Sequence, residues 1–287
     1  MPQLKHILFP VDFSEGCRSF APTVRAVACR TAARLTMLNV LELPSGYYSN
    51  PYAILTFKDI VSSMRRERAE FRKFLAPEFA PLPGVRRISK HGDVAGIIND
   101  FARRNEADLI MMPTHGVGPF RRFLIGSVTA KVLHDATCPV WTSAHVPEER
   151  DPEQIRKILC AVDFGARSVE VMQYASWLAK TFGAELRFVN VVAVSESWTV
   201  RCFEADFIDS LIAEAREQLT KIQSQAATPG DSLIRSGDIA HSVRREALEW
   251  GADAIVIGRG VITETLGRLR TESYHIIRES PCSVVSV

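Results

Sequence analysis

Short apolar runs alternate with amphipathic stretches along the whole chain. The runs predict strands, and the stretches between them place apolar residues at the 3.6-residue spacing of helices whose other face is charged. Strands that alternate with helices favour a parallel sheet covered on both faces. The pattern therefore predicts an α/β fold, and in the first half five strands are expected at residues 4–11, 34–40, 85–90, 109–112 and 140–143.

The second half of the chain repeats the first. KHILFPVDF at residues 5–13 returns as RKILCAVDF at residues 156–164, which pairs Asp12 with Asp163 at a shift of 151 positions. Further along, the shift drifts to 145 and then to 144, as small deletions in loops would produce. The repeat is as long as a domain, which excludes a short solenoid unit. We expect two duplicated domains, residues 1–145 and 153–287.

Three candidate binding residues stand at the carboxyl ends of expected strands. They are Asp12, Val40 and Pro113. In a parallel sheet, ligands bind beyond these ends, where the strand order reverses. Three separate parts of the sequence thus point to one crevice. For Asp12 the alternative is an acid satisfied by backbone amides beside a helix, although its repetition as Asp163 favours the crevice.

A glycine-containing loop leads from the strand at 109–112 into a helical pattern at 127–135. Its two ends read Pro113-Thr114-His115-Gly116 and Gly126-Ser127-Val128. Backbone N–H groups at a helix start lack partners and carry the positive end of the helix dipole, and glycine lets a phosphate approach closely. Ser127 is expected to cap the helix or to bind a phosphate, and His115 to touch that phosphate or only to line the loop. The alternative is that the glycines serve only tight turns.

Composition narrows the class of protein. At 287 residues, with 46% hydrophobic and 24% charged residues, the chain is long enough for two cores. No apolar run approaches the ~18 residues of a membrane span, and the start lacks a signal-peptide layout, so a cytoplasmic protein is expected. Six cysteines without paired spacing predict reduced, mostly buried thiols. The seven histidines show no metal-ligand spacing, so no metal site is expected.

Charge differs between the halves. Residues 1–144 hold 19 Lys and Arg against 12 Asp and Glu, a net charge of +7, and the remainder carries −5. A basic half suits a polyphosphate ligand, whereas the alternative is a solvated helix face around residues 65–73. Nucleic-acid binding is disfavoured because no recognition motif appears.

Together the motifs resemble those of universal stress proteins. The segments that carry the resemblance are KHILFPVDFS, LTMLNVLE, HGD before a helix, ADLIMMPTHG, and G-x9-G-S followed by TCPVW. The similarity covers nearly the whole chain twice, as in the tandem form of the family. It implies two Rossmann-like domains, of the flavodoxin-like and adenine nucleotide alpha hydrolase-like kind, each with a five-stranded parallel sheet. It also implies that the last strands of the halves pair about a pseudo-two-fold axis.

The family's nucleotide signature, G-x2-G-x9-G-[S/T], is kept in part. Gly116, Gly126 and Ser127 match it, whereas Pro113 stands where the family has its first glycine. Proline has no N–H, which excludes one main-chain donor near the ribose. By resemblance, the ligand is ATP, with Mg²⁺ as an optional companion. Its adenine would meet Asp12 and Val40, its ribose Pro10 and Pro113, and its phosphates Gly116, Gly126, Ser127 and Val128.

The second half departs further from the signature. Asp163, Val191, Gly258 and Gly260 keep their places, but Arg270 and Thr271 stand at the positions of Gly126 and Ser127. A long cationic side chain there blocks close backbone approach by a phosphate. We expect this degenerate crevice to hold no ATP and to be a structural or regulatory copy.

Several functions are compatible with these residues. The first is an adenine nucleotide-binding stress or signalling module, in which ATP changes the surface shown to an unidentified protein partner. An enzyme is not expected beyond a slow ATPase, because residues 114–125 contain no Lys, Asp or Glu for phosphoryl transfer. The third is a ligand-free, chaperone-like module. A homodimer remains open.

Overall fold

The first half of the chain alternates strands and helices as the sequence predicts. The computed structural model describes residues 4–42, 57–114, 125–144, 151, 154–194, 205–259 and 271–287. The elements of the first half are β1 (His6–Val11), α1 (Glu15–Thr31), β2 (Arg34–Leu41), α2 (Phe57–Lys73), β3 (Arg86–His91), α3 (Val94–Arg104), β4 (Leu109–Met112), α4 (Ser127–Asp135) and β5 (Val140–Thr142).

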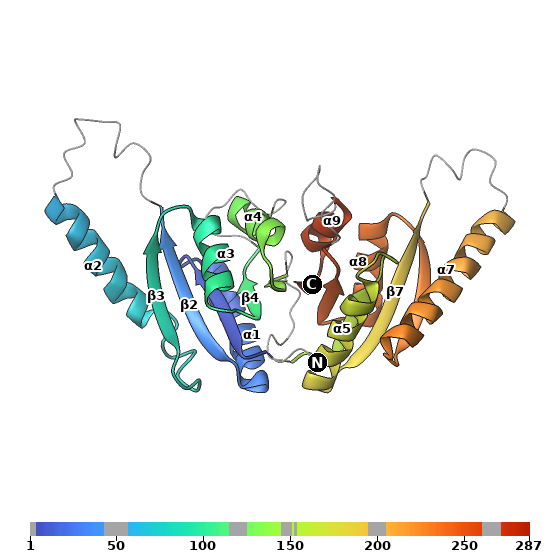
Figure 1. Cartoon of the computed structure of the whole chain (residues 1–287), viewed down its shortest axis with the longest axis horizontal. Coiled ribbons are helices and arrows are strands. Elements are labelled where there is room, and N and C mark those ends of the chain that lie inside the picture. The colour runs from blue at the N-terminus through green and yellow to red at the C-terminus, as the bar shows by residue number, and fades with distance from the viewer. Residues whose placement is uncertain are drawn as a thin grey trace, which may run out of the picture.

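The second half repeats this order. Its elements are β6 (Lys157–Ala161), α5 (Ser168–Phe182), β7 (Glu185–Ala193), α7 (Ala205–Ala226), β8 (Asp231–Gly237), α8 (Ile239–Trp250), β9 (Ala254–Ile257), α9 (Thr271–Glu279) and β10 (Ser283–Ser286). The prediction of a duplicated α/β fold is confirmed, and Figure 1 shows the two halves on either side of the middle of the molecule, with α2 and α7 at the outer ends.

One continuous ten-stranded sheet runs through both halves. Its strand order is β3-β2-β1-β4-β5-β10-β9-β6-β7-β8, and within each half the pairings are parallel. The halves meet where β5 and β10 pair antiparallel, with Trp141 opposite Val285 and Thr142 opposite Val284. The expected pairing of the two last strands is therefore present, and each strand covers an edge that the other half would leave open.

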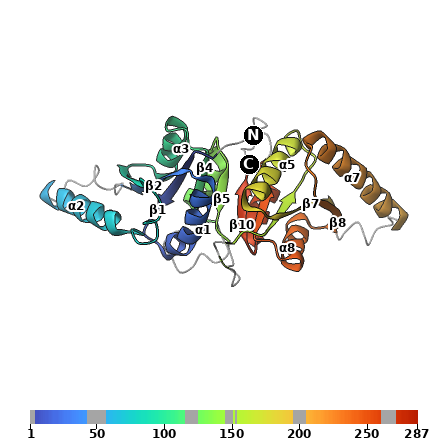
Figure 2. The same ribbon diagram turned by 90° about the horizontal axis from the view of Figure 1, so that it is seen from below.

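Helices cover both faces of the sheet and enclose two cores. Residues of α1, α2, α5 and α7 pack on one face, and residues of α3, α4, α8 and α9 pack on the other. Figure 2 shows α1 and α3 on opposite sides of the strands of the first half, and α5 and α8 on opposite sides of those of the second. Side chains alternate along β1, where Ile7 and Phe9 belong to the first core and Leu8 to the second. Fully buried strands of this kind explain why the apolar runs in the sequence are nearly continuous.

The two halves also contact each other beside the strand joint. Trp141 of β5 is fully buried, and its ring lies 6.4 Å from that of Phe182 at the end of α5, edge to face. Nearby, Arg30 Nε donates to the carbonyl oxygen of Thr181 at 2.6 Å. The halves thus share apolar surface as well as strand hydrogen bonds.

Polar side chains cap two of the helix starts. Ser14 precedes α1 and its hydroxyl accepts from Cys17 N at 3.2 Å, and the carboxylate of Asp93 accepts from Gly96 N at 2.9 Å at the start of α3. Each cap satisfies a first-turn N–H that the helix leaves open.

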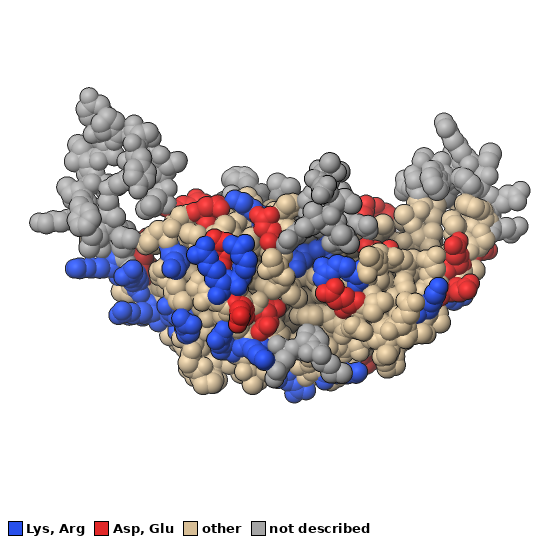
Figure 3. Space-filling model, viewed as in Figure 1, with Lys and Arg blue, Asp and Glu red and all other residues tan. Residues whose placement is uncertain are grey.

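Lysine and arginine gather on the first half of the surface (Figure 3). On α2 they are exposed at Arg65, Arg66, Arg68, Arg72 and Lys73, as expected for a solvated helix face. Within the described part of the chain, no helix has the length and apolar content needed to span a membrane.

Candidate functional site

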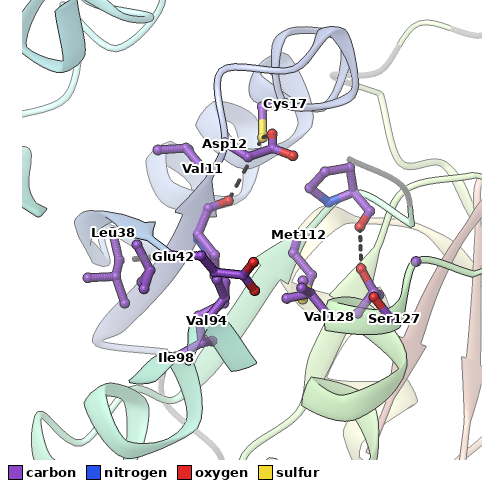
Figure 4. Close-up of a pocket in the computed structure, with 15 residues that line it drawn as sticks. Val11, Asp12, Cys17, Leu38, Glu42, Val94, Ile98, Met112, Ser127 and Val128 are labelled. Atoms are coloured by element: carbon purple, nitrogen blue, oxygen red, sulfur yellow. Dashed lines mark hydrogen bonds between the residues drawn. The ribbon is translucent and has the colours of Figure 1, made fainter. Parts of the chain in front are cut away.

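A cavity of about 350 Å³ opens at the carboxyl ends of β1, β2 and β4, beside the start of α4 (Figure 4). Most of the predicted binding residues line it: Pro10, Asp12, Val40, Pro113, Gly126, Ser127 and Val128. The sequence prediction of one crevice is thus met by residues more than one hundred positions apart in the chain. His115 and Gly116 lie outside the described residues.

Asp12 is held at the mouth of the cavity by the chain that follows it. Its Oδ1 accepts from Ser14 N at 3.0 Å and from the thiol of Cys17 at 3.2 Å. Phe13, between Asp12 and Ser14, has a positive φ of 62°, which turns the chain sharply after the strand. The acid is exposed while its orientation is fixed. It therefore accepts from a backbone amide, as the alternative interpretation expected, and still lines the cavity.

Cys17 is a lining residue that sequence reasoning missed. Burial raises the pKa of its thiol to about 12, so the group stays protonated and donates to Asp12. Its equivalent in the second half, Ser168, donates to Asp163 Oδ1 at 3.3 Å. The repeat of a small donor at this place was the signal in the sequence.

Asn39 is a second residue that sequence reasoning missed, and it supports the site by bonding the end of the neighbouring strand β1. Its side chain is buried, and Nδ2 donates to the carbonyl oxygen of Val11 at 3.0 Å. Asn190 does the same for Val162 at 2.7 Å in the second half. Each asparagine ties the end of one strand to its neighbour just before the aspartate, so it positions Asp12 or Asp163.

An apolar wall closes the far side of the cavity. Val94 and Ile98 come from one face of α3, and Leu38 and Met112 come from β2 and β4. The β1–β2 pairing ends at Asn39, whereas β2 continues to pair with β3 through Leu41. The main chain of Val40 consequently passes the cavity beyond the end of β1.

The start of α4 forms the opposite end of the cavity. Gly126 is the N-cap, with φ −56° and ψ 143°, and as a glycine it has no side chain with which to cap the helix. Of the two roles expected for Ser127, that of helix cap is wrong, because Ser127 is already the first helical residue, and that of phosphate ligand stays a prediction. Two hydrogen bonds fix the start: Gly126 N donates to Thr114 O at 2.9 Å, and the Thr129 hydroxyl donates to Pro113 O at 3.1 Å.

Charge in the cavity is negative among the described lining residues. These include the carboxylates of Asp12 and Glu42 and no lysine or arginine. Glu42 follows β2, is exposed, and was not predicted from the sequence. Among the described residues no three His, Cys, Asp or Glu side chains gather as a metal site.

A second cavity, of about 200 Å³, occupies the equivalent place in the other half. Asp163, Val191 and Gly258 line it as predicted, and Thr271 begins α9. Asp163 Oδ1 accepts from Gly165 N at 2.9 Å, and the Ser273 hydroxyl donates to Gly258 O at 3.1 Å, which matches the bonds around Asp12 and Pro113. Gly260 and Arg270 lie outside the described residues.

Comparison with known proteins agrees with this architecture. A profile described as "Universal stress protein family" matches residues 3–143 and 154–287. A universal stress protein of Thermus aquaticus, encoded in the region 3′ of a QAH/OAS sulfhydrylase, is 31% identical over 136 residues, which cover 47% of this chain and 96% of that protein.

Solved structures extend the likeness to the whole chain. A crystal structure of a universal stress protein from Archaeoglobus fulgidus aligns over 99% of this chain and 96% of its own, with a TM-score of 0.70 and 21% identity. A universal stress protein in complex with cAMP aligns over 46% of this chain and 95% of its own, with a TM-score of 0.34 and 19% identity.

Proposed function

The chain belongs to the universal stress protein family, and from that premise we propose that its first half binds an adenine nucleotide, ATP, as a stress-response or signalling module. The observation that carries the proposal is the cavity beside α4. It joins an apolar slot at one end to an open helix start at the other, and its volume of about 350 Å³ falls in the range of ligand pockets.

The apolar slot suits a purine base. Val40, Val94 and Met112 provide the flat hydrophobic surface on which a base loses its hydration. The main chain of Val40 runs past the end of β1, so its peptide groups are placed to hydrogen-bond the edge of the base. Asp12 lies at the mouth, where its carboxylate accepts a hydrogen bond from a ligand N–H or O–H.

The start of α4 suits the phosphates. Because the N-cap residue Gly126 has no side chain to cap this helix, the first-turn N–H groups of Ser127 and Val128, which line the cavity, are suited to a ligand phosphate and carry the positive end of the dipole. Pro113 adds no N–H donor, but its carbonyl oxygen fixes Thr129 within the first turn. A magnesium ion that arrives with ATP would accompany the phosphates at the start of α4, whereas the described carboxylates of the lining, Asp12 and Glu42, stand at strand ends, so the described residues offer it no carboxylate ligand there.

Binding rather than catalysis is the role proposed. Fast phosphoryl transfer usually needs a lysine on the phosphates and carboxylates for magnesium, and the loop of residues 114–125 contains no Lys, Asp or Glu. At most a slow ATPase fits this lining. We further propose that the protein works in the cytoplasm and that the nucleotide changes its affinity for a protein partner.

The proposal is tested by titrating the purified full chain with ATP in a calorimeter, after any nucleotide released by denaturation has been identified. Gly126→Arg places in the first half the residue type that the second half carries at the equivalent Arg270, and it should abolish ATP binding. Asp163→Ala, in the second cavity, is the matched control for Asp12→Ala and should leave binding of ATP unchanged. Wild-type protein that binds no ATP, or Gly126→Arg protein that binds it normally, contradicts the proposal.

The enzymatic alternative has its own measurement. Steady-state phosphate release is followed for wild-type protein and for the Asp12→Ala and Gly126→Arg variants. We expect release near the buffer background in all three. Rapid release that disappears in both variants would instead assign an ATPase to this cavity.

A further inference from the structure

The second cavity keeps the walls of the first at the end proposed for the base. Asp163, Asn190, Val191, Ile239, Val243 and Ile257 line it at the positions of Asp12, Asn39, Val40, Val94, Ile98 and Met112. The aspartate is held by the same kind of bonds, and the asparagine donates to the equivalent carbonyl oxygen. A ligand that uses only this end meets nearly the same surface in both halves.

Among the described residues, the phosphate end of the second cavity differs in charge from that of the first; Arg270, at the position of Gly126, lies outside them. Glu272, the second residue of α9, lines the cavity where the first cavity has Val128. At the end of β7, the second half has Ala193 where the first half has Glu42. Besides its aspartate, each cavity thus has one carboxylate, at the strand end in the first and at the helix start in the second.

A carboxylate in the first turn of a helix interacts favourably with the positive end of the dipole, as an anionic ligand does, so it compensates part of the charge that a phosphate would compensate. A phosphate brought to the same place meets a like charge at short range. The cavity is also smaller, about 200 Å³ against about 350 Å³.

We propose that the second cavity binds an uncharged purine nucleoside, and that Glu272 rejects its 5′-phosphorylated forms. The inference rests on the proposed function, because the base end is identified by its likeness to the first cavity. The chain then carries two sites that distinguish a nucleotide from the nucleoside left when its phosphates are removed.

The test uses the full chain with Gly126→Arg, which closes the first cavity, titrated with adenosine and with AMP in a calorimeter. Adenosine should bind at one site, and AMP should bind about tenfold more weakly or not at all. Adding Glu272→Val should reduce the preference for adenosine over AMP by about tenfold, and Glu272→Gln, which keeps the shape of the side chain, should reduce it similarly. Equal affinity for the two ligands, or a preference that Glu272→Val leaves intact, overturns the proposal.

A reciprocal variant gives a second measurement that does not depend on the folding of Gly126→Arg protein. Val128→Glu in the otherwise wild-type chain places the acid of the second cavity in the first. It should weaken AMP binding at the first site by about tenfold relative to adenosine, and an unchanged ratio overturns the role given to the acid.

The same titrations separate this inference from the proposed function. If wild-type protein binds ATP and Gly126→Arg protein binds no adenosine, the inference is overturned and the nucleotide site stands. If wild-type protein binds no ATP while Gly126→Arg protein prefers adenosine to AMP, the second site stands and the proposed function is overturned.

Discussion

Arg259 donates from its guanidinium to the carbonyl oxygen of Ala136 at 2.9 Å, across the boundary between the two halves. A second bond of 2.9 Å reaches the carbonyl oxygen of Cys138. These carbonyls follow the last turn of α4, the helix whose first turn lines the first cavity. Arg259 itself is buried and directly follows Gly258, which lines the second cavity. One side chain thus connects the rim of one cavity to the helix of the other.

Arg259→Met should therefore lower stability. The change leaves buried carbonyl oxygens without their charged donor, which costs about 2–3 kcal/mol, and it also removes a cation from the negative end of α4. Urea unfolding measures the loss. Arg103→Met, which breaks an exposed pair with Asp100, is the control and should cost at most about 1 kcal/mol. Equal midpoints for the two variants would show that the bonds across the boundary contribute nothing.

Asn39→Ala and Asn190→Ala form a matched pair of variants. Each leaves a strand-end carbonyl oxygen without its donor, so each should cost about 1–3 kcal/mol in urea unfolding. Asn39→Ala alone should weaken ATP binding, because only Asn39 supports the strand end at Asp12. A similar loss of ATP affinity in Asn190→Ala would contradict the assignment of the nucleotide to the first cavity.

Stability should fall as the solution is acidified below about pH 6.5, the ordinary pKa of histidine. Burial lowers the pKa of His6 in the folded protein, although the carbonyl oxygen of Asn105 and the nearby Asp108 act in the opposite direction. Between the folded and unfolded pKa values, the unfolded chain binds more protons, so stability is present above this window and is lost as the pH falls through it.

The measurement is the urea midpoint at pH 7.5 and pH 5.5. His6→Gln should be less sensitive to this pH change than wild-type protein, whereas His241→Gln, at an exposed position, should keep the wild-type sensitivity. An identical response in His6→Gln protein would mean that other groups produce the acid loss.

Cysteine reactivity should be confined largely to Cys29 among the described thiols. Cys29 is exposed, Cys17, Cys160 and Cys282 are buried, and burial raises the pKa of Cys138 to about 11. In a Cys202→Ser background, a thiol reagent at pH 8 should modify one cysteine quickly and the other four only after denaturation. Loss of the fast phase in Cys29→Ser protein identifies it, and rapid modification of Cys17 would contradict the buried environment described above.

Much of the fold could be predicted from the sequence because apolar runs and helix caps act locally. The bounds of β4 and α4 agree with the prediction residue for residue, and Asp12 lies in the cavity as its position after β1 indicated. The prediction that Ser127 caps α4 failed because the backbone angles of Gly126 make that residue the N-cap, and the residue types alone do not reveal those angles.

Residues whose role depends on distant contacts were missed. Glu42 lines its cavity because β2 ends just before it, and Glu272 lines the other because α9 begins just before it; no local pattern marks either residue. Arg270 drew attention in the sequence because it replaces a glycine, whereas Arg259 makes its bonds to carbonyls more than 120 positions away. Such bonds follow only from the pairing of β5 with β10.

That pairing has an evolutionary consequence. Two identical chains joined through the same strands must carry every substitution twice, so an acid introduced into one pocket appears in its mate as well. Here both partners are encoded in a single polypeptide, and each pocket accepts mutations of its own while the shared seam stays intact. Duplication followed by fusion thus allows the two pockets to differ in sequence, and so to take different ligands, which two identical chains do not allow.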